Sequence, residues 1–378
     1  MSSDFLIIGG GIAGASAGYF LAERGRVLML EREDSLGYHS TGRSAALYTE
    51  TYGNAAIRAL TVCSGPFFRD PPAGFTEHPL LAPRGVLMAA PPEGEAKFRA
   101  AVAEAQHHAP TVRAISQKEA LRLCPVLRPE WFRFAFHEPD AMDMDVHAIH
   151  QGFLRGLRAR GGTIVTGAEV QAISRQASDW NATTRAGDFA APIVINAAGA
   201  WADEVARLAG VRPVGLVPKR RTAFIIDLPA GTDAAAWPVV GDVDETFYFK
   251  PEAGRLLVSP ADETPVPPCD VQPEEMDVAE AAHRLEARTR IAVTRVVRKW
   301  AGLRSFVRDK TPVVGHAPEA PGFVWLAGQG GYGIQTSPSM GRVAAALATG
   351  CDLPADLVAR GLTATDLLPD RLYAAPLS

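Results

Sequence analysis

The sequence predicts an α/β fold of two structural domains, one of which opens with a Rossmann-like nucleotide-binding unit. The chain has 378 residues, two to three times the length of a usual domain. Residues 4–31 follow the order strand, glycine-rich turn, helix, strand. The composition is 47% hydrophobic and 21% charged, which is typical of globular proteins and excludes disordered or collagen-like chains.

The N-terminal unit has the pattern of a dinucleotide-binding turn. Its parts are, in order, a strand at 5–8, the turn Gly9-x-Gly11-x-x-Gly14, a helix at 12–24 ended by Gly25, and a strand at 27–30. Gly9 permits a tight turn, Gly11 lets the backbone approach a pyrophosphate, and Gly14 lets helix and strand pack closely. Glu31 follows the second strand, where it is expected to accept hydrogen bonds from a ribose.

This unit alone does not separate NAD from FAD, and a nicotinamide dehydrogenase is the alternative. Three further segments favour a flavin. Residues 37–46 are small and polar and are similar to the loop and helix start that hold the pyrophosphate in flavoproteins. Residues 191–210 predict a strand, a narrow turn and an amphipathic helix. Residues 323–347 predict a buried strand, a loop with four glycines, and a helix that begins near Ser337 or Pro338.

Charge and cysteine content limit the partners. The net charge is −4 without any block of like charge, so nucleic acid is not an expected partner. The four cysteines lie far apart, and we expect free thiols in a reducing cytoplasm. Since residues 5–8 already belong to a strand, we expect no signal peptide, and no apolar run reaches the length of a membrane span. The expected location is the cytoplasm, with peripheral attachment to the inner membrane face as the alternative.

Several longer stretches resemble one family of flavoproteins. The stretches GYHSTGRSAA, NAAGAW, PKRR, WAGLRSF and QGGYGIQTS begin at Gly37, Asn196, Pro218, Trp300 and Gln329. In this order they resemble the D-amino-acid oxidase family of FAD oxidoreductases, which includes glycine and sarcosine oxidases. The stretches are most similar to those of its bacterial D-arginine dehydrogenases.

The resemblance implies a Rossmann-like FAD-binding domain interleaved with an antiparallel-sheet substrate domain. The FAD domain would comprise residues 1–80, 140–215 and 300–378, and the substrate domain residues 81–139 and 216–299. The residues agree with this arrangement. Residues 145–160 predict a helix, and strands are predicted at 163–166, 85–90, 222–228, 246–249 and 256–259. The proline-rich stretch 260–273 predicts a long surface loop.

The resemblance also implies the reaction. A hydride would pass from the α-carbon of a D-amino acid to flavin N5, and the imino acid would hydrolyse to a 2-oxo acid and ammonia. Such a reaction needs a carboxylate clamp, which suits the planar fork of arginine. By position in the matching stretches, the candidates are Arg221 and Arg304, with the phenols of Tyr52 and Tyr248. The carbonyl of Gly331 would accept the substrate's amine.

The same comparison assigns residues to the cofactor. The resemblance implies FAD contacts from the glycine turn, from the segment after it, and from the later glycine-rich loops. These are Gly9, Gly11, Gly14, Glu31, Arg32, Thr41, Gly42, Arg43, Ser44, Ala46, Val170, Gly199, Trp201, Gly302, Ile334 and Gln335. Some relatives attach FAD through a cysteine in the segment that corresponds to residues 303–305. No cysteine stands there, so we expect non-covalent FAD.

Departures from the D-arginine dehydrogenases concern the substrate pocket. Val86 stands where those enzymes carry a glutamate that pairs with the guanidinium of the substrate, and Leu47 replaces a histidine. The stretch Val239-Val240-Gly241 has smaller side chains than the pocket wall of those enzymes. Because a buried cation without a partner is costly, we expect D-Arg and D-Lys to be poor substrates and neutral, apolar D-amino acids to be preferred.

The electron acceptor is expected to be a quinone or another carrier, with oxygen as the alternative. In sarcosine oxidase a lysine near the flavin promotes the reaction with oxygen, and residues 254–258 contain no lysine. Two other functions remain open. One is a secondary-amine oxidoreductase acting on sarcosine, proline or hydroxyproline, and the other is a flavin-binding sensor or inactive subunit.

A metal site is not expected. Asp140, Asp143, Asp145, His147 and His150 lie close together in the sequence. Carboxylates at the start of a helix are ordinary caps, however, and this gives them a structural role.

Overall fold

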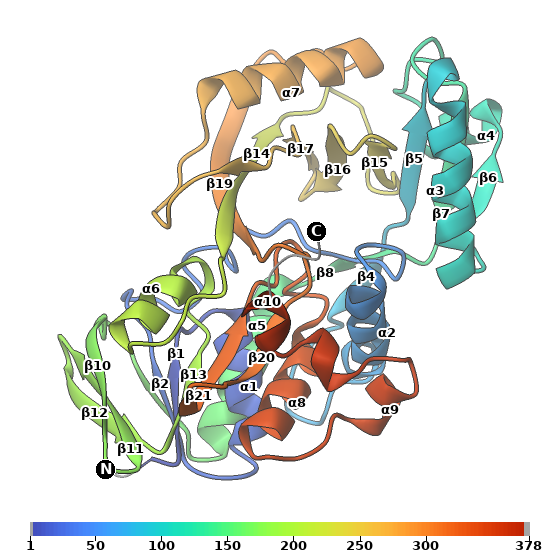
Figure 1. Cartoon of the computed structure of the whole chain (residues 1–378). Helices are drawn as coiled ribbons and strands as arrows, with labels where there is room; N and C mark the ends of the chain where they lie inside the picture. Colours follow the sequence, from blue (N-terminus) through green and yellow to red (C-terminus); the bar gives the residue numbers. More distant parts are fainter. Residues whose placement is uncertain (1–2, 374–378) are drawn as a thin grey trace.

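A six-stranded sheet forms the lower half of the molecule in Figure 1, which shows a computed structural model that describes residues 3–373. Its strand order is β20–β21–β13–β1–β2–β9, and all neighbours are parallel except β20 and β21. The strands are β1 (Phe5–Ile8), β2 (Val27–Leu30), β9 (Thr163–Val165), β13 (Ile193–Asn196), β20 (Val313–Ala317) and β21 (Ala320–Ala327). Both strands predicted for the N-terminal unit are confirmed.

Both faces of this sheet are covered, which explains why β1 is apolar at every position. Ile7 packs into the core under the helices, whereas Leu6 and Ile8 pack into the core on the opposite face. The helices on the first side are α1 (Ile12–Leu21), α2 (Ala55–Arg69), α5 (Val146–Ala159), α8 (Ser337–Ala348) and α9 (Ala355–Val358). The other face carries α6 (Ala202–Leu208) and a small sheet of β10 (Val170–Gln176), β11 (Asp179–Thr184) and β12 (Gly187–Ala191).

Helix α1 is shorter than predicted. It ends at Leu21 rather than Arg24, because the Arg24 amide donates to the Leu21 carbonyl in a tightened turn before Gly25. The helices predicted at 145–160 and from Ser337 are confirmed, with Asp145 as the cap of α5. Residues 37–43 form turns, so the helix start expected in that stretch is wrong.

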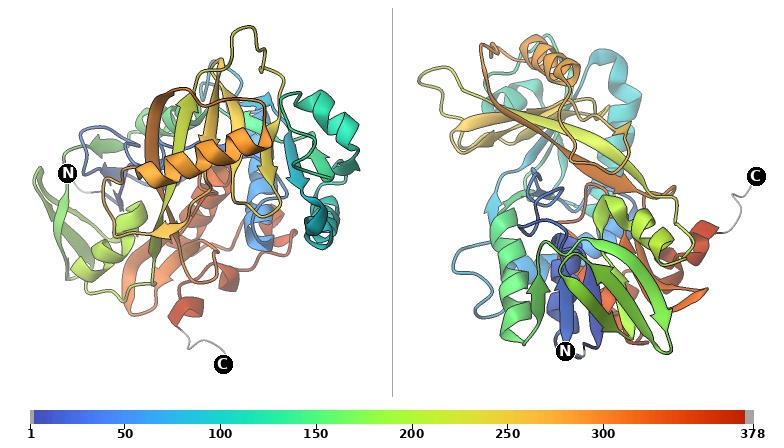
Figure 2. Two further views of the ribbon diagram at one scale, coloured as in Figure 1. Left: turned by 90° about the horizontal axis from the view of Figure 1, so that it is seen from above. Right: turned by 90° about the vertical axis from the view of Figure 1, so that its left-hand side faces the viewer.

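A nine-stranded sheet forms the roof above the first sheet in Figure 1, and the right-hand view of Figure 2 shows the same stacking. Its order is β18–β14–β17–β16–β15–β5–β7–β6, with β19 paired to β14. Its pairs are antiparallel except β15 with β5. The strands are β5 (Val86–Ala90), β6 (Arg113–Ile115), β7 (Phe134–Glu138), β14 (Val217–Ile226), β15 (Val239–Asp242), β16 (Tyr248–Glu252), β17 (Arg255–Ser259), β18 (Thr264–Pro265) and β19 (Val296–Phe306).

Two helices, α4 (Gln117–Leu123) and α7 (Glu275–Arg288), cover the outer face of the roof. Helix α3 (Glu95–His108) packs on the opposite face, against Ala90 and Phe136. The predicted strands of this region are confirmed with shifted ends. The stretch 260–273, predicted as a loop, contains the two-residue strand β18, which pairs with β14. The fold class is thus confirmed as a Rossmann-like domain with a second, largely antiparallel sheet.

A third sheet of short strands lies at the junction of the two halves. It consists of β3 (Leu47–Tyr48), β8 (Met142–Met144) and β4 (Leu81–Pro83). The domain ranges remain a prediction, and their boundary at residue 300 falls inside β19. The remaining short helices are η1 (Pro92–Gly94), η2 (Gly199–Trp201), η3 (Ala364–Asp366) and α10 (Asp370–Tyr373). Within residues 3–373, no helix is long and apolar enough to cross a membrane.

Candidate active site

A cavity of about 800 Å³ lies between the roof and the carboxyl ends of β1 and β13. Its lower wall comes from the turn after β1 (residues 11–13), the segment 40–47 and the turn after β13. Its upper wall comes from the roof strands β5, β14, β15, β16 and β19. Ligands of doubly wound α/β proteins bind at this edge of the sheet.

The glycine turn at the lower wall is shaped for close approach of a ligand. A Cβ on Gly14 would lie 1.9 Å from the Gly9 carbonyl oxygen, so the turn can only form without a side chain there. A Cβ on Gly11 would meet only the Thr41 hydroxyl, at 3.3 Å, and Gly11 faces the cavity. The Ile12 amide at the start of α1 donates to Thr41 Oγ1 at 3.0 Å. These residues fit a bound pyrophosphate at a helix N-terminus.

The predicted cofactor residues divide into two groups. Those that line the cavity are Gly11, Thr41, Arg43, Ser44, Ala46, Gly199, Gly302, Ile334 and Gln335. Those outside its lining are Gly9, Gly14, Glu31, Arg32, Gly42, Val170 and Trp201. Arg32 lies with its guanidinium over the Trp201 ring at 4.8 Å, so these two are brought together beside the turn.

Glu31 is used by the glycine turn itself. It is 8% exposed, and its Oε2 accepts a hydrogen bond from the Gly10 amide at 2.8 Å while Oε1 accepts one from the Glu33 amide at 2.9 Å. Each carboxylate oxygen keeps a further lone pair. The role in ribose binding therefore stays a prediction, and a role in bracing the turn is added to it.

The predicted catalytic residues meet at the other end of the cavity. Tyr52, Arg221, Tyr248, Arg304 and Gly331 all line it. Arg221 pairs with Gly302 in the β14–β19 register, which makes Arg304 its diagonal neighbour on the same face. An Arg304 guanidinium nitrogen donates to the Tyr52 hydroxyl at 3.4 Å. Two guanidinium groups and a phenol thus share one wall.

Gly331 lies directly against Arg304. A Cβ at position 331 would be 2.9 Å from the Arg304 Cζ, which only glycine avoids. The predicted acceptor, the Gly331 carbonyl, therefore sits on a backbone that passes next to the arginine. The backbone predicted to bind the amine and the arginine predicted to bind the carboxylate are thus neighbours.

The charge at this wall is only partly balanced. Arg221 has Glu263 as an ion-pair partner at 3.2 Å, while no described carboxylate lies within ion-pair distance of Arg304. Burial, and then the neighbouring Arg304, lower the pKa of Arg221. Two like charges at the wall of a cavity favour the binding of an anion.

Arg220 does not compete for the clamp role. It is 5% exposed, and its guanidinium pairs with Asp262, Glu274 and Asp277 away from the cavity lining. Alternation along β14 places neighbouring side chains on opposite faces of the sheet, so Arg220 and Arg221 have different surroundings.

The four predicted pocket residues are brought together. Leu47, Val86, Val239 and Gly241 all line the cavity, and the first three pack in one apolar cluster with Met88, Ala141 and Tyr248. This cluster forms the apolar end of the cavity, next to Tyr248 of the clamp.

The structure adds a carboxylate that the sequence prediction missed. Glu138 is 3% exposed, lines the cavity, and pairs directly with Val86 across β5 and β7. Its two oxygens accept hydrogen bonds from the hydroxyls of Thr49 and Thr51, each at 2.8 Å. An acidic residue at the end of the strand, after Phe134, Ala135, Phe136 and His137, was the only sequence signal for it.

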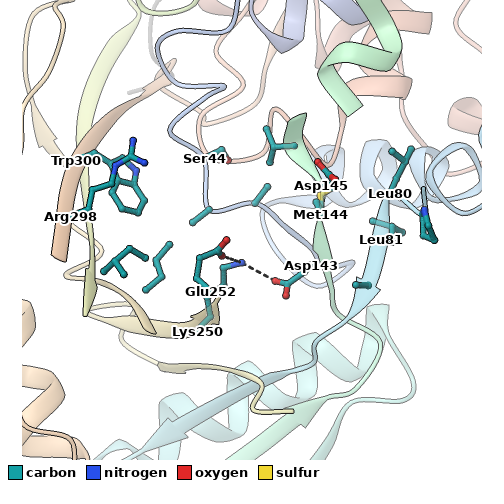
Figure 3. Close-up of a pocket in the computed structure, with 17 residues that line it drawn as sticks. Ser44, Leu80, Leu81, Asp143, Met144, Asp145, Lys250, Glu252, Arg298 and Trp300 are labelled. Atoms are coloured by element: carbon teal, nitrogen blue, oxygen red, sulfur yellow. Dashed lines mark hydrogen bonds and ion pairs between the residues drawn. The ribbon is translucent and has the colours of Figure 1, made fainter. Parts of the chain in front are cut away.

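A smaller cavity of about 610 Å³ adjoins the first, and Figure 3 shows its lining. Ser44 and Lys250 belong to the walls of both cavities. The ammonium of Lys250 is held by Asp143 and Glu252, each at 2.9 Å. Lys250 is thus a lysine near the cofactor end that lies outside the stretch 254–258.

The acidic and histidine residues near α5 serve separate roles. Asp143 pairs with Arg84 and Lys250, Asp145 caps α5 at the Ala148 amide, and His150 Nε2 lies 2.9 Å from the Gly10 carbonyl oxygen. Among residues 3–373, no group of three or more such side chains is arranged to hold a metal ion.

The glycine turn, the cavity at the sheet edge and the roof with its arginine pair define a dinucleotide-dependent oxidoreductase. The family model described as "FAD dependent oxidoreductase" matches residues 4–347. The chain therefore belongs to this family, also known as the DAO family, and its cofactor is FAD.

Known proteins with this fold are distant in sequence. "FAD-dependent oxidoreductase domain-containing protein 1" of Bos taurus is 26% identical, over 91% of this chain and 80% of that protein. Glycine oxidase of Geobacillus kaustophilus is 24% identical over 97% of this chain and 95% of its own. The crystal structure of L-proline dehydrogenase from P. horikoshii has a TM-score of 0.82 at 21% identity, and covers 96% of this chain and 99% of that chain.

Proposed function

We propose that this protein catalyses the FAD-dependent oxidative deamination of D-amino acids to 2-oxo acids and ammonia. The observation that carries the proposal is the wall on which Arg221, Arg304 and Tyr52 converge beside the backbone of Gly331. An α-amino acid carries a carboxylate and an amine on one carbon. A wall that offers two guanidinium groups next to a backbone carbonyl matches that pair of groups.

Each residue of the wall has a part in the reaction. Arg304 and Arg221 bind the substrate carboxylate, with the phenols of Tyr52 and Tyr248 as hydrogen-bond donors, and the Gly331 carbonyl accepts a hydrogen bond from the neutral amine. This arrangement fixes the direction of the α C–H bond. FAD, when bound, supplies the acceptor for the hydride. The amine also loses a proton, and water then converts the imine to the 2-oxo acid and ammonia.

The preferred substrate has a neutral side chain. Leu47, Val86 and Val239 give the pocket an apolar wall, and Gly241 leaves room beside Met88. A D-Arg side chain would lose its hydration at this wall, where Val86 offers no charge and the oxygens of the neighbouring Glu138 already accept hydrogen bonds from Thr49 and Thr51. Aliphatic, thioether and aromatic D-amino acids are therefore the proposed class.

We further propose non-covalent FAD, a carrier such as a quinone as electron acceptor, and a cytoplasmic location. Leu303, Arg304 and Ser305 offer no cysteine for a covalent link. Lys250 approaches the cofactor end, but its ammonium is held by Asp143 and Glu252, which supports a carrier over oxygen. The free cysteines fit a reducing compartment. Acid precipitation should release the yellow colour into the supernatant, and slow reoxidation in air should accompany fast reoxidation by a quinone.

The deciding experiment is anaerobic reduction of the purified flavoprotein by a panel of amino acids. D-Leu, D-Met and D-Phe are expected to bleach the flavin faster than D-Arg, D-Lys or any L-amino acid. A faster reaction with D-Arg than with D-Leu contradicts the side-chain preference. A flavin that stays oxidised with every amino acid contradicts the reaction and favours a binding or sensor role.

A second candidate is the oxidation of a secondary amine. L-proline dehydrogenase, whose named substrate is a secondary amine, shares this fold, and the wall of Arg221 and Arg304 would suit a carboxylate whatever the amine. The same panel, extended with sarcosine, proline and hydroxyproline, separates the two. Faster bleaching by a secondary amine than by every D-amino acid selects the second candidate.

A further inference from the structure

Glu138 is a deeply buried charged group of the main cavity that the proposed reaction leaves unused. It is 3% exposed, and no described arginine or lysine lies within ion-pair distance of it. The charged groups that act on it are Glu50 on the facing segment and Asp140 in the turn after β7, and both are carboxylates. Its partner across β5 is the apolar Val86. Burying a carboxylate in such surroundings costs free energy. Residues of this kind are typical of functional sites.

The side-chain carboxylate of Glu138 accepts its hydrogen bonds from one segment of the chain, residues 49–51. Side chains alternate along residues 48–51. Tyr48 and Glu50 bond to each other at 2.7 Å, while Thr49 and Thr51 both turn to Glu138. The next residue is Tyr52, whose hydroxyl accepts from Arg304. Glu138 therefore joins the roof sheet to the segment that carries one member of the clamp.

The anchored segment is also tied to the lower half of the molecule. The Thr49 amide lies 3.3 Å from the Gln335 side-chain oxygen, and the Gln335 amide nitrogen donates to Thr61 on α2 at 3.0 Å. Thr49 is thus held from the roof by Glu138 and from below by Gln335. These contacts fix the position of Tyr52 between the Rossmann-like domain and the roof sheet.

A carboxylate suits this task better than a neutral group. Ionised Glu138 only accepts, so both hydroxyl hydrogens must point to it, and the 3.1 Å contact between the two threonine oxygens then carries no hydrogen. A protonated Glu138 would donate to one threonine, and the hydrogen of that threonine would turn to the other. The protonation state therefore decides how the segment is held.

We propose that Glu138, as a carboxylate, is a positioning residue for substrate binding: by accepting the hydroxyls of Thr49 and Thr51, it holds Tyr52 in the carboxylate clamp. This inference rests on the proposed function. Burial raises the pKa of Glu138, and the hydroxyls of Thr51 and Thr49 oppose that rise without cancelling it. As the pH falls, Glu138 is therefore expected to be protonated, and its hold on Thr49 and Thr51 to weaken, at a higher pH than for an ordinary glutamate.

The test compares Glu138→Met, Glu138→Gln and Thr51→Val with wild type. Anaerobic flavin reduction at increasing substrate concentration gives a substrate Kd and a limiting rate. Methionine at position 138 fills the space of the glutamate but is at best a weak hydrogen-bond acceptor, whereas glutamine keeps one acceptor oxygen. We expect the Kd to rise roughly tenfold in E138M, the loss of about one hydrogen bond to a charged group, and less in E138Q. The rise in Kd should be the same for D-Leu, D-Met and D-Phe, because the clamp binds the carboxylate that all three share.

Glu50→Gln is the matched control, since Glu50 belongs to the same segment but faces Tyr48 and lies outside the cavity lining. Its substrate Kd should stay at the wild-type value. The wild-type Kd should rise on acidification, and this rise should be smaller in E138Q, which keeps only the part that comes from protonation of the substrate amine. Unchanged Kd in E138M with a lower Tm would show a merely structural role and overturn the proposal. A Kd that changes for some side chains only would show contact with the substrate side chain and also overturn it.

Two further outcomes keep the proposal testable. If E138M does not fold, T51V decides, because valine has the shape of threonine without the hydroxyl, and an unchanged Kd there overturns the proposal. If no amino acid reduces wild-type FAD, the proposed reaction fails instead. Benzoate binding, followed by the flavin spectrum, then replaces substrate binding. Equal benzoate affinity in wild type and E138M overturns the inference.

Discussion

The two ends of the main cavity are built in different ways. The cofactor end is built on the glycine turn from Gly9 to Gly14, whose residues are close in sequence and whose shape follows from the absence of side chains. The substrate end is made of large polar side chains, such as Arg221, Tyr248 and Arg304, from strands far apart in the chain. Changes at the cofactor end should therefore alter FAD binding, and changes at the substrate end should alter turnover while FAD stays bound.

The largest effect is expected for Arg304→Met. The substrate carboxylate would lose the guanidinium that has no ion-pair partner among the described residues, and kcat/KM should fall roughly a hundred- to a thousandfold with FAD content unchanged. Arg221→Met should cost less, because Arg221 is already paired with Glu263. Steady-state kinetics with D-Leu measure both. Arg298→Met is the control, since Arg298 is exposed on the same strand and outside the main cavity. A greater loss in R221M than in R304M would contradict this order.

At the cofactor end, Gly11→Ala should weaken FAD binding roughly ten- to a hundredfold. The added Cβ would meet only Thr41 Oγ1 in the protein, so the apoprotein should keep its Tm. Equilibrium dialysis of FAD and a melting curve of the apoprotein measure the two quantities. Gly14→Ala is the contrast, because its Cβ would overlap the Gly9 carbonyl and should lower the Tm as well. If G11A keeps wild-type FAD affinity, the turn does not approach the cofactor as proposed.

A smaller effect is expected for Val86→Glu at the substrate end. A carboxylate there would offer a partner to a guanidinium, so the ratio of kcat/KM for D-Arg to that for D-Leu should rise about tenfold. The gain is limited because Glu138 lies directly opposite, and like charges at paired positions are unfavourable. Val86→Gln, which has the same shape without the charge, should leave the ratio near its wild-type value. An unchanged ratio in V86E would show that position 86 does not face the substrate side chain.

This contrast also explains how much the sequence could predict. The strands at 5–8 and 27–30 and the role of Gly14 depend on neighbours within a few residues, so the pattern specifies them. Glu138 could not be found, because its importance depends on the β5–β7 register and on two threonines almost ninety residues earlier in the chain. The same holds for Lys250, whose place near the cofactor end depends on contacts with Asp143. Local patterns do not contain the pairing of distant strands.

The smallest effect concerns stability at the cofactor end and its dependence on pH. Burial lowers the pKa of His150, which is 4% exposed and lies with Nε2 2.9 Å from the Gly10 carbonyl oxygen. The unfolded chain, with an ordinary histidine pKa of about 6.5, then binds more protons than the folded chain, so stability should fall as the pH drops below that value. Melting curves measure the fall in Tm between pH 8 and pH 5, which we call the acid loss of Tm. This acid loss should be smaller in His150→Gln than in wild type, by a few degrees. His147→Gln, on the exposed side of α5, removes only the last and smallest cause of the lowered His150 pKa, so its acid loss of Tm should stay close to that of wild type. Glu138 acts in the opposite direction, because its raised pKa removes stability as the pH rises, but it is common to all three proteins and cancels in the difference. An equal acid loss in H150Q and H147Q would mean that His150 does not brace the glycine turn as a neutral ring.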